Sequence, residues 1–539
     1  MAILGLYVIR ILQLSRRNLS GVFSFARRKE ISVVIWVFIL AFGALLGYQA
    51  YWQLFIHNQD FMETLKLHDP RPWIIEATTQ KGTIYDRHHD DATFLAGYAQ
   101  KAANEQSRRY YPLGDATSHI IGYSDVERGK AGLEKIFFNE LMGRTQNTPE
   151  EKENYINNKF FRIKPVGNDI TLTLDYDLQK TAYEAFGDKR GAVVAIEPST
   201  GDVLVMVSAP SYHPDSVSVD AAWVRIIKDS EGKRLYNRAL KGRYPPGSTF
   251  KPIVASAALD NGIDPIYTIG ANGYLPPGVH RKRVYDHERA AYRKRGRIWH
   301  GQGTIDMTRA LVKSSNAYFA RLGVTTGDSI MHAIAYNFGY NQPFHWNTSH
   351  PALQKELVVF RSSFPPTKNA HELAWSCIGQ QEVLATPIEL AMTAAAIAND
   401  GVLMRPKLEL NQKPEIWHHV ISPETAKRVR MMMREVVWAR GGTAWRMRMK
   451  KLEAGGKTGT AELTKIITHK DGTRERTIVN NAVFISFAPV ENPKIAIAVI
   501  AEEAGYGGSA AAPIAKEVYK KALELGYFNT DGKTSKDIP

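Results

Sequence analysis

The octapeptide Pro-Pro-Gly-Ser-Thr-Phe-Lys-Pro at residues 245–252 places a serine and a lysine three positions apart at the predicted start of a helix. Positions i and i+3 of a helix lie on the same face, so the amine of Lys251 can reach the hydroxyl of Ser248. A serine needs a neighbouring base of this kind to act as a nucleophile. A hydroxyl that only caps the helix is the alternative interpretation, and this motif alone does not exclude it.

The same Ser-x-x-Lys spacing recurs at Ser230 and Lys233, which shows how weak the motif is by itself. That copy lies in the polar turn 228–233, where no helix aligns the two side chains, so we interpret it as a chance match. The interpretation of Ser248 therefore depends on further motifs.

Two motifs downstream favour the catalytic interpretation. Residues 314–316, Ser-Ser-Asn, offer a hydroxyl and an amide two positions apart within a helix-like stretch. Residues 457–460, Lys-Thr-Gly-Thr, offer a cation and two alternate hydroxyls at a predicted strand start, where Gly459 permits close approach of another backbone. The three motifs together make a chance occurrence a poor explanation.

Apolar runs around these motifs predict an α+β domain. Runs 192–196 and 203–207 flank a turn, as do runs 481–488 and 494–501, so each pair predicts a β-hairpin. Helical periodicity fills the region between the hairpins, in residues 254–260, 304–322, 386–399 and 423–438. We therefore expect an antiparallel sheet, assembled from sequence-distant halves and flanked by helices.

The three motifs, in this order, resemble the active-site set of the class B penicillin-binding proteins, the monofunctional peptidoglycan transpeptidases that one N-terminal helix anchors. The resemblance covers nearly the whole chain after the anchor. It includes residues 81–87, 95–96, 111–112, 132–134, 172–175, 237–238, 379–380, 386–387, 398–401 and 511–513. The chain departs from the family at residues 88–91, which replace the usual Asn-Gly turn, and in a short non-catalytic pedestal. The resemblance implies the penicillin-binding, serine acyl-transferase fold.

The resemblance also implies the chemistry of the first two motifs. Ser248 would attack the carbonyl between the terminal D-alanines of a peptidoglycan stem peptide, with Lys251 as its general base. Ser314 would relay the proton to the leaving amine, and Asn316 would hold the lysine and the substrate amide. The acyl-enzyme would then cross-link to an amine of a neighbouring stem peptide, and β-lactams would acylate the same serine.

For the third motif the resemblance implies substrate binding. Lys457 would supply positive potential, and the hydroxyls of Thr458 and Thr460, on either side of Gly459, would bind the terminal carboxylate. The backbone N–H groups of Ser248 and Thr460 would form the oxyanion hole. This chemistry implies neither a metal nor an organic cofactor.

The N-terminal region predicts a membrane anchor. Residues 31–59 contain no charged side chain, and their apolar heart at 33–50 is long enough for a bilayer, since about 20 helical residues span its roughly 30 Å core. No cleavage signal follows, so we expect the anchor to be retained, with Tyr48, Tyr51 and Trp52 at the outer interface. Six basic residues and only one acidic residue, Glu30, precede the apolar run. By the positive-inside rule we expect the N-terminus in the cytoplasm, the anchor in the inner membrane and the rest of the chain outside, in the periplasm. The six basic residues are Arg10, Arg16, Arg17, Arg27, Arg28 and Lys29.

These signals predict four segments: a cytoplasmic tail at 1–30, a transmembrane anchor at 31–53, a pedestal for dimerisation or partner contacts at 54–188, and a transpeptidase domain at 189–539. The chain has 539 residues, of which 44% are hydrophobic and 23% charged, which is a globular composition. Its net charge of +15 favours anionic partners such as phospholipids or wall polymers. The expected export of the chain argues against nucleic acid as a partner. The single cysteine excludes an intramolecular disulfide.

Several conspicuous residues receive simpler interpretations. The cluster His88, His89, Asp90 and Asp91 could bind a metal, but a solvated loop is favoured. A solvated loop is also favoured over phosphate or glycan binding for the basic stretch at 281–297. Cys377 is expected to be a small core residue, and Gly43 and Gly47 form a G-x-x-x-G pattern that a helix partner could use.

Four other functions fit the sequence less well. A bifunctional synthase would need a glycosyltransferase domain, for which the pedestal is too short. A β-lactamase would need a deacylating group that the sequence does not reveal, a β-lactam sensor would need further membrane helices, and a non-catalytic scaffold would not need the intact motifs. The absence of a polymerising site implies a separate partner, a polytopic glycosyltransferase of the shape, elongation, division and sporulation (SEDS) family, bound through the anchor and pedestal. The sequence leaves the cellular role open.

Overall fold

The computed structural model describes residues 29–55, 76, 79–98, 109–125, 127–145, 149–160, 167–468 and 474–529. The chain divides into two compact units, residues 1–76 and 77–539. Nearly all of the predicted cytoplasmic tail, and the side chain of Trp52, lie outside the described part.

The first unit contains helix α2 (Lys29–Phe55). Its stretch Val33–Tyr51 is the one helix in the described residues that is long and apolar enough to cross a membrane. Large apolar side chains are exposed all around it, Phe38 at 72% and Leu40 at 69%. A helix that exposes apolar groups on every side needs an apolar environment, so the structure agrees with a single-pass anchor.

A five-stranded antiparallel sheet organises the second unit, in the order β13-β14-β15-β7-β8. The strands are β7 (Arg190–Ile196), β8 (Val203–Ala209), β13 (Gly455–Thr468), β14 (Arg474–Ala488) and β15 (Ile495–Glu502). Pairing of β15 with β7 sets Val499 opposite Val193 and joins the two predicted hairpins. Both the hairpins and the assembly of the sheet from distant halves are thus confirmed.

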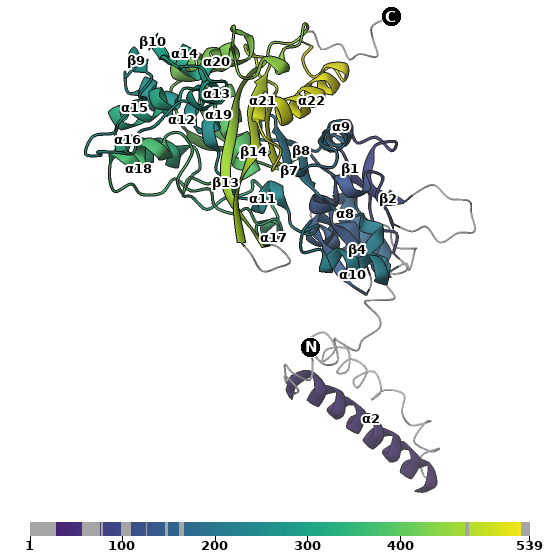
Figure 1. Cartoon of the computed structure of the whole chain (residues 1–539). Helices are drawn as coiled ribbons and strands as arrows, with labels where there is room; N and C mark the ends of the chain where they lie inside the picture. The colour runs from purple at the N-terminus through teal and green to yellow at the C-terminus, as the bar shows by residue number, and fades with distance from the viewer. Residues whose placement is uncertain are drawn as a thin grey trace, which may run out of the picture. The chain divides into compact units, whose positions relative to one another are not determined.

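Helices cover both faces of this sheet, as Figure 1 shows. Helices α9 (Tyr176–Phe186) and α22 (Ala512–Glu524) lie on one face, and α12 (Lys251–Asp260), α19 (Pro387–Ala398) and α20 (Pro423–Trp438) on the other. Every residue of β8 is buried, which explains why its sequence is apolar without alternation. The α+β architecture predicted from the sequence is confirmed.

The helices begin where the sequence supplies caps. Thr386 accepts from the N–H of Glu389 at the start of α19, Ser422 accepts from the N–H of Thr425 at the start of α20, and proline follows each cap. The remaining helices of this region are α10 (Asp220–Lys228), α11 (Arg238–Lys241), α13 (His287–Lys294), α14 (Met307–Lys313), α15 (Asn316–Thr326), α16 (Asp328–Asn337), α17 (Pro351–Glu356), α18 (Ala370–Ser376) and α21 (Gly507–Ala510). Short strands pair as β9 (Tyr267–Gly270) with β10 (Gly301–Ile305) and as β11 (Val402–Met404) with β12 (Ile416–His419).

The predicted continuous helix over residues 304–322 is wrong. The segment consists of the end of β10, then α14, a break, and α15. The break is at Ser314, whose φ of 55° and ψ of 39° are left-handed. Helical periodicity resumes after the break, which is why the apolar pattern does not reveal it.

The region before residue 188 contains a small sheet and short helices. Its strands, in the order β3-β2-β1-β6, are β1 (Ile84–Tyr85), β2 (Phe94–Tyr98), β3 (Arg109–Tyr110) and β6 (Ile170–Thr171). A hairpin of β4 (Tyr123–Asp125) and β5 (Gly129–Ala131) and helices α5 (Ser118–Ile121), α6 (Gly132–Ile136), α7 (Phe138–Leu141) and α8 (Pro149–Phe160) complete it. One hydrophobic core continues from Ile84 in this region to Tyr519 in α22.

The acidic and histidine side chains at residues 88–91 contact different groups. His88 Nε2 lies 3.0 Å from Asp175 Oδ2, and His89 Nδ1 lies 2.7 Å from Thr171 Oγ1. Asp91 accepts from the hydroxyl of Tyr85 at 2.7 Å. These contacts tie the turn to the fold, and they aim the side chains at separate partners.

Candidate active site

Ser248 lies in a single 3-10 turn, Gly247–Phe250, directly before α12, and its side chain is half-buried. The turn contacts two other segments. The N–H of Gly247 donates to the carbonyl of Gly379 at 2.9 Å, and the edge strand β13 packs against the same turn. Gly247 has a φ of 53°, and a Cβ there would lie only 2.7 Å from the carbonyl oxygen of Thr460. Glycine is therefore required before the serine, both for its backbone angle and for the close approach.

Lys251, in the first turn of α12, is fully buried. Its Nζ donates to the carbonyl of Ser314 at 2.6 Å and to Oδ1 of Asn316 at 2.7 Å, and lies 3.3 Å from Oγ of Ser314. The Oγ of Ser248, which the i, i+3 spacing predicted as a partner, is not among its hydrogen-bond partners in the described structure. The tertiary acceptors supplied by the Ser314 break hold the amine instead.

Lys457, in β13, also contacts Ser314. Its Nζ donates to Oγ of Ser314 at 2.9 Å and to the carbonyl of Thr458 at 2.8 Å. The left-handed backbone at Ser314 turns both its carbonyl and its hydroxyl toward the two amines. A non-glycine residue in this conformation costs about 1–3 kcal/mol, which the surrounding contacts must offset.

No carboxylate in the described part of the chain is bonded directly to either of the two buried amines. Burial lowers the pKa of Lys251 to about 7, against the opposing influence of Asp286 and Glu288. Burial also lowers the pKa of Lys457 well below its usual range, and the neighbouring Lys251 lowers it further. An amine with a pKa near neutrality can take up a proton at physiological pH.

A buried carboxylate that sequence reasoning missed anchors the middle motif. Asp286 accepts from the hydroxyl of Ser315 at 2.9 and 3.0 Å and from the N–H of Ala317 at 2.9 Å. The carbonyl of Tyr285 accepts from Nδ2 of Asn316 at 3.2 Å, which fixes the amide so that its oxygen faces Lys251. About thirty residues of sequence separate Asp286 from Ser315 and Ala317, so no local sequence pattern predicts these contacts.

The third motif lies on the exposed edge of the sheet. Strand β13 pairs only with β14 in the described structure, so one side of its backbone has no strand neighbour and can face a ligand. Thr458 is buried and its hydroxyl donates to Oγ1 of Thr443 at 2.7 Å, a partner that sequence reasoning also missed. Thr460 is partly exposed. At Gly459 a Cβ would lie 2.7 Å from the carbonyl of Pro246, so glycine lets the strand approach the serine turn.

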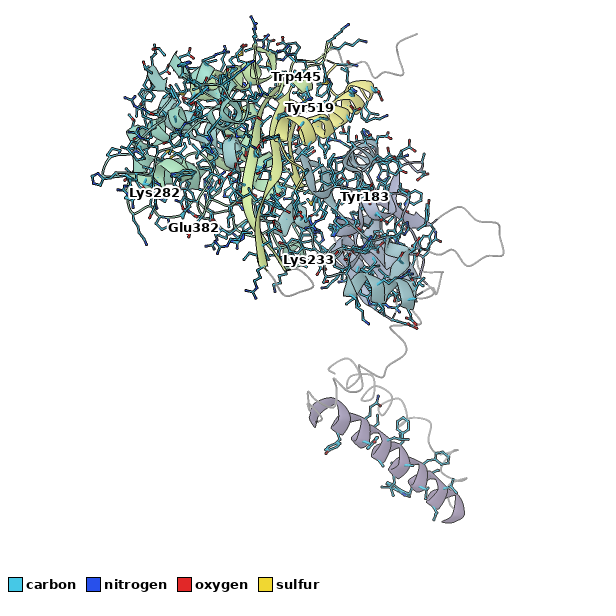
Figure 2. All side chains as sticks on the ribbon, viewed as in Figure 1. Tyr183, Lys233, Lys282, Glu382, Trp445 and Tyr519 are labelled. Atoms are coloured by element: carbon cyan, nitrogen blue, oxygen red, sulfur yellow. The ribbon has the colours of Figure 1, made fainter. Side chains whose placement is uncertain are left out.

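The three motifs therefore meet in one place. The structure brings together Ser248, Lys251, Ser314, Asn316, Lys457, Thr458, Gly459 and Thr460. The chance match at Ser230 and Lys233 follows α10 and lies elsewhere on the surface, where Figure 2 labels Lys233. The arrangement of a half-buried hydroxyl, an amine with a pKa near neutrality and a second lysine amine suits nucleophilic acyl transfer.

Comparison with known proteins agrees with this geometry. The family described as penicillin binding protein transpeptidase domain matches residues 191–520. The peptidoglycan D,D-transpeptidase PbpA of Mycolicibacterium smegmatis is 33% identical over 78% of this chain and 84% of its own length. The peptidoglycan D,D-transpeptidase MrdA of Acinetobacter baumannii is 31% identical over 77% of this chain and 66% of its own length.

Solved structures show the same relationship. The ceftriaxone acyl-enzyme complex of penicillin-binding protein A from M. tuberculosis superposes with a TM-score of 0.69 at 27% identity, covering 83% of this chain and 99% of that one. Pseudomonas aeruginosa PBP2 superposes with a TM-score of 0.64 at 28% identity, covering 85% and 98%. Both the catalytic domain and most of the preceding region thus have counterparts in these proteins. This chain belongs to the penicillin-binding protein transpeptidase family and is a class B peptidoglycan D,D-transpeptidase.

Proposed function

We propose that Ser248 is the nucleophile that cross-links peptidoglycan. Its oxygen attacks the carbonyl between the two terminal D-alanines of a donor stem peptide, the peptide C–N bond breaks, and D-alanine leaves with a proton. An amine of a neighbouring stem peptide then attacks the ester and releases Ser248. The observation that carries this proposal is the convergence of Lys251 and Lys457 on Ser314 beside the serine turn.

Lys251 acts as the general base in this proposal. A neutral amine has two N–H groups and one lone pair. The two shortest contacts, to the carbonyl of Ser314 and Oδ1 of Asn316, use both N–H groups and leave the lone pair to accept the proton of Ser248. Burial supports this protonation state, because it lowers the pKa to about 7. Catalytic hydrogen bonds are often long without substrate and tighten when it binds, which accounts for the missing Ser248 contact.

Ser314 and Lys457 return the proton to the leaving group. Oγ of Ser314 lies between the two amines, 3.3 Å from Lys251 and 2.9 Å from Lys457, so a proton can pass through this hydroxyl to the departing nitrogen. Lys457, with Thr458 and Thr460, also binds the terminal carboxylate, whose negative charge favours the protonated form of the Lys457 amine. A charge-assisted contact of this kind contributes about 1.5–3 kcal/mol.

The oxyanion that forms on the attacked carbonyl is held by the N–H groups of Ser248 and Thr460. The close packing of Gly247 against Thr460 supports this assignment, because it sets the two backbones side by side. Loss of one such donor typically lowers acyl-transfer rates by about 10²-fold.

β-Lactams acylate Ser248 in the same way, since the related M. tuberculosis protein has a ceftriaxone acyl-enzyme complex. The test is intact mass spectrometry of the full chain after incubation with benzylpenicillin. A persistent adduct of one penicillin, lost in Ser248→Ala and retained in the control Ser230→Ala, supports the proposal. An adduct that disappears within minutes supports a β-lactamase, and an adduct that survives Ser248→Ala places the nucleophile elsewhere.

Helix α2 anchors the enzyme with its N-terminus in the cytoplasm and the catalytic region outside. The charge asymmetry around residues 31–59 supports this orientation. Its test is protease protection in sealed vesicles of known sidedness, with a tag at each terminus. When protease is added to right-side-out vesicles, loss of the C-terminal tag with protection of the N-terminal tag supports this orientation. The reverse pattern contradicts it.

The glycan-polymerising partner is a polytopic SEDS-type glycosyltransferase, bound through α2 and the pedestal. A Cβ at Gly43 or Gly47 would meet nothing within 4 Å, so both glycines offer an open surface to a partner helix. Gly43→Leu is expected to weaken co-purification in detergent while penicillin labelling stays intact. If replacement of the whole anchor by an unrelated membrane helix leaves co-purification unchanged, the helix is only a tether.

A further inference from the structure

The loop between β9 and α13 carries three consecutive cations, Arg281, Lys282 and Arg283, which line an open pocket of about 520 Å³. The other lining residues are Tyr285, His371, Trp375, Gln380 and Gln381. The lining thus combines cations with aromatic and amide groups and contains no carboxylate. We propose that this pocket is an anion subsite, which binds a carboxylate that the donor stem peptide carries on the N-terminal side of its D-Ala-D-Ala end. This inference rests on the function proposed above.

Both rims of the pocket are joined to the catalytic residues. On one rim, the carbonyl of Tyr285 accepts from Asn316, whose oxygen holds Lys251. On the other rim, Gln380 follows Gly379, whose carbonyl accepts from the N–H of Gly247 beside the nucleophile. Two lining residues of the pocket are thus linked to the reaction site, one through a hydrogen bond and the other through its chain neighbour.

The cationic loop is held in place at both ends. Asp286 ties its C-terminal end to Ser315 and Ala317. Val284 exchanges backbone hydrogen bonds of 2.8 and 2.9 Å with Tyr274, and Nη1 of Arg283 lies 3.4 Å from the carbonyl of Asn272. A loop fixed in this way presents its charges without a large ordering cost when a ligand binds.

The positive charge of the pocket is not neutralised internally. In the described part of the chain, no ion pair within 4.0 Å engages Arg281, Lys282 or Arg283, and Arg281 and Lys282 are exposed. Burial and the field of Lys282 lower the pKa of His371, which lies within this positive region. The neighbouring acids Glu372 and Glu382 are outside the lining, and Figure 2 labels Glu382 and Lys282 on the same side of the molecule.

The position of the pocket favours the donor peptide as the ligand. The terminal carboxylate of the donor is assigned to β13, which contacts the serine turn through Thr460. In this inference the rest of the donor extends from the scissile bond toward Gly379, which bonds to the serine turn and whose neighbour Gln380 lines the pocket. An acidic residue in this part of a stem peptide would bring its carboxylate to the cations, and the planar guanidinium groups suit that group.

The test uses two thioester donors that differ in one group. Both are γ-D-Glu-(Nε-acetyl-Lys)-D-Ala-D-thiolactate, with the α-carboxylate of the glutamate either free or converted to a carboxamide. Attack by Ser248 forms the ester, breaks the C–S bond and releases a thiol that carries the serine proton, so thiol release gives kcat/KM for each donor. The full chain is assayed in a zwitterionic detergent.

The parent enzyme is expected to prefer the free carboxylate by about tenfold, the effect of one charge-assisted contact at a partly exposed site, and to lose this preference at high salt. The double substitution Arg281→Gln and Arg283→Gln should lower the ratio of kcat/KM for the free-carboxylate donor to kcat/KM for the carboxamide donor to about one. Arg293→Gln, which removes an exposed cation of α13 outside the lining, should keep it. The ratio is internal to each protein, so a partial loss of folded enzyme does not change it.

Equal kcat/KM values for the two donors in the parent, or an unchanged ratio in the double variant, would overturn the anion subsite and leave the proposed function standing. If millimolar inorganic pyrophosphate inhibits both donors equally in the parent and neither in the double variant, the pocket binds phosphate groups and the inference is also wrong. Failure of the parent to form an acyl-enzyme with either donor and with benzylpenicillin would overturn the proposed function itself.

Discussion

Two clusters of titratable side chains in this enzyme are built on opposite principles. His350, at the start of α17, lies between two carboxylates, with Nε2 3.0 Å from Glu140 and Nδ1 3.1 Å from Glu409. The hydrogen bonds to Glu140 and Glu409 raise the pKa of His350 to about 10. In the active site, two lysine amines lie close together and bond to neutral oxygens. Burial there lowers the pKa of Lys251 to about 7.

The difference separates a structural cation from a reactive one. A cation paired with carboxylates is stabilised in its charged form and joins segments of the fold, here α7 and α17. An amine buried without a bonded carboxylate is destabilised in its charged form, which suits a base that must be neutral before the reaction. In the active site, the chemistry makes use of this unfavourable arrangement.

Removal of the reactive amine should have the largest effect. Lys251→Met keeps most of the side-chain volume but removes the base, so the rate of Ser248 acylation by benzylpenicillin should fall by about 10³-fold, within the range of general-base losses. Stopped-flow or time-resolved mass spectrometry measures this rate. Lys233→Met, in the chance Ser-x-x-Lys copy, is the matched control and should react normally. A variant that retains more than a tenth of the parent rate would mean that another group takes the proton.

Removal of the structural cation should affect stability instead of chemistry. His350→Gln leaves Glu140 and Glu409 without a counter-charge, and we expect a loss of about 2 kcal/mol, less than for a fully buried pair because the imidazole is 24% exposed. The pKa of His350 is higher in the folded protein than in the unfolded chain. Its contribution to the free energy of unfolding is therefore complete below the unfolded-state pKa of about 6.5, and it disappears as the pH rises through the folded-state pKa of about 10.

Urea denaturation of the parent and the variant at several pH values measures that difference. His345→Gln, at an exposed histidine nearby, is the control and should change stability by less than about 0.5 kcal/mol. A His350→Gln effect that stays constant from pH 6 to pH 10, or that lowers acylation, would show that this histidine is not a purely structural cation.

Substitution of Asp286 should have a smaller effect on acylation than substitution of Lys251. The carboxylate of Asp286 positions Ser315 and Ala317 and also raises the pKa of Lys251 through space. Asp286→Asn should slow acylation by roughly tenfold through loss of an acceptor at the Ser314 turn. It should also shift the rising limb of the pH profile toward lower pH. A slower rate with an unshifted limb would assign Asp286 a positioning role alone.

The sequence predicted the sheet and the site because their signals are local. Apolar runs, hairpin turns and caps such as Thr386 and Ser422 mark the elements directly. The three sequence motifs identified the residues that the fold brings together at the candidate active site. What the sequence could not reveal depends on tertiary contacts. No local pattern announces a left-handed serine inside a periodic stretch, so the break at Ser314 was missed.

The same reason explains the direction of the Lys251 side chain. Helical spacing placed its amine near Ser248, but the carbonyl exposed by the Ser314 break and the amide of Asn316 are better acceptors, and they come from residues more than sixty positions away. The Asp286 anchor and the Thr443 partner of Thr458 are likewise distant in sequence. Composition identified a basic stretch at 281–297, and only the fold distinguishes the pocket-lining cations from those on α13.

Lys251 is proposed to act as a neutral base at physiological pH, and the pH dependence of Ser248 acylation tests this role most directly. The second-order rate constant for benzylpenicillin, measured from pH 5.5 to 9.5 at constant ionic strength, should rise tenfold per pH unit at low pH and level off with an apparent pKa near 7, the value that burial gives Lys251. A rate that keeps rising to pH 9.5, as an ordinary lysine would produce, or one that is flat throughout, would contradict the account.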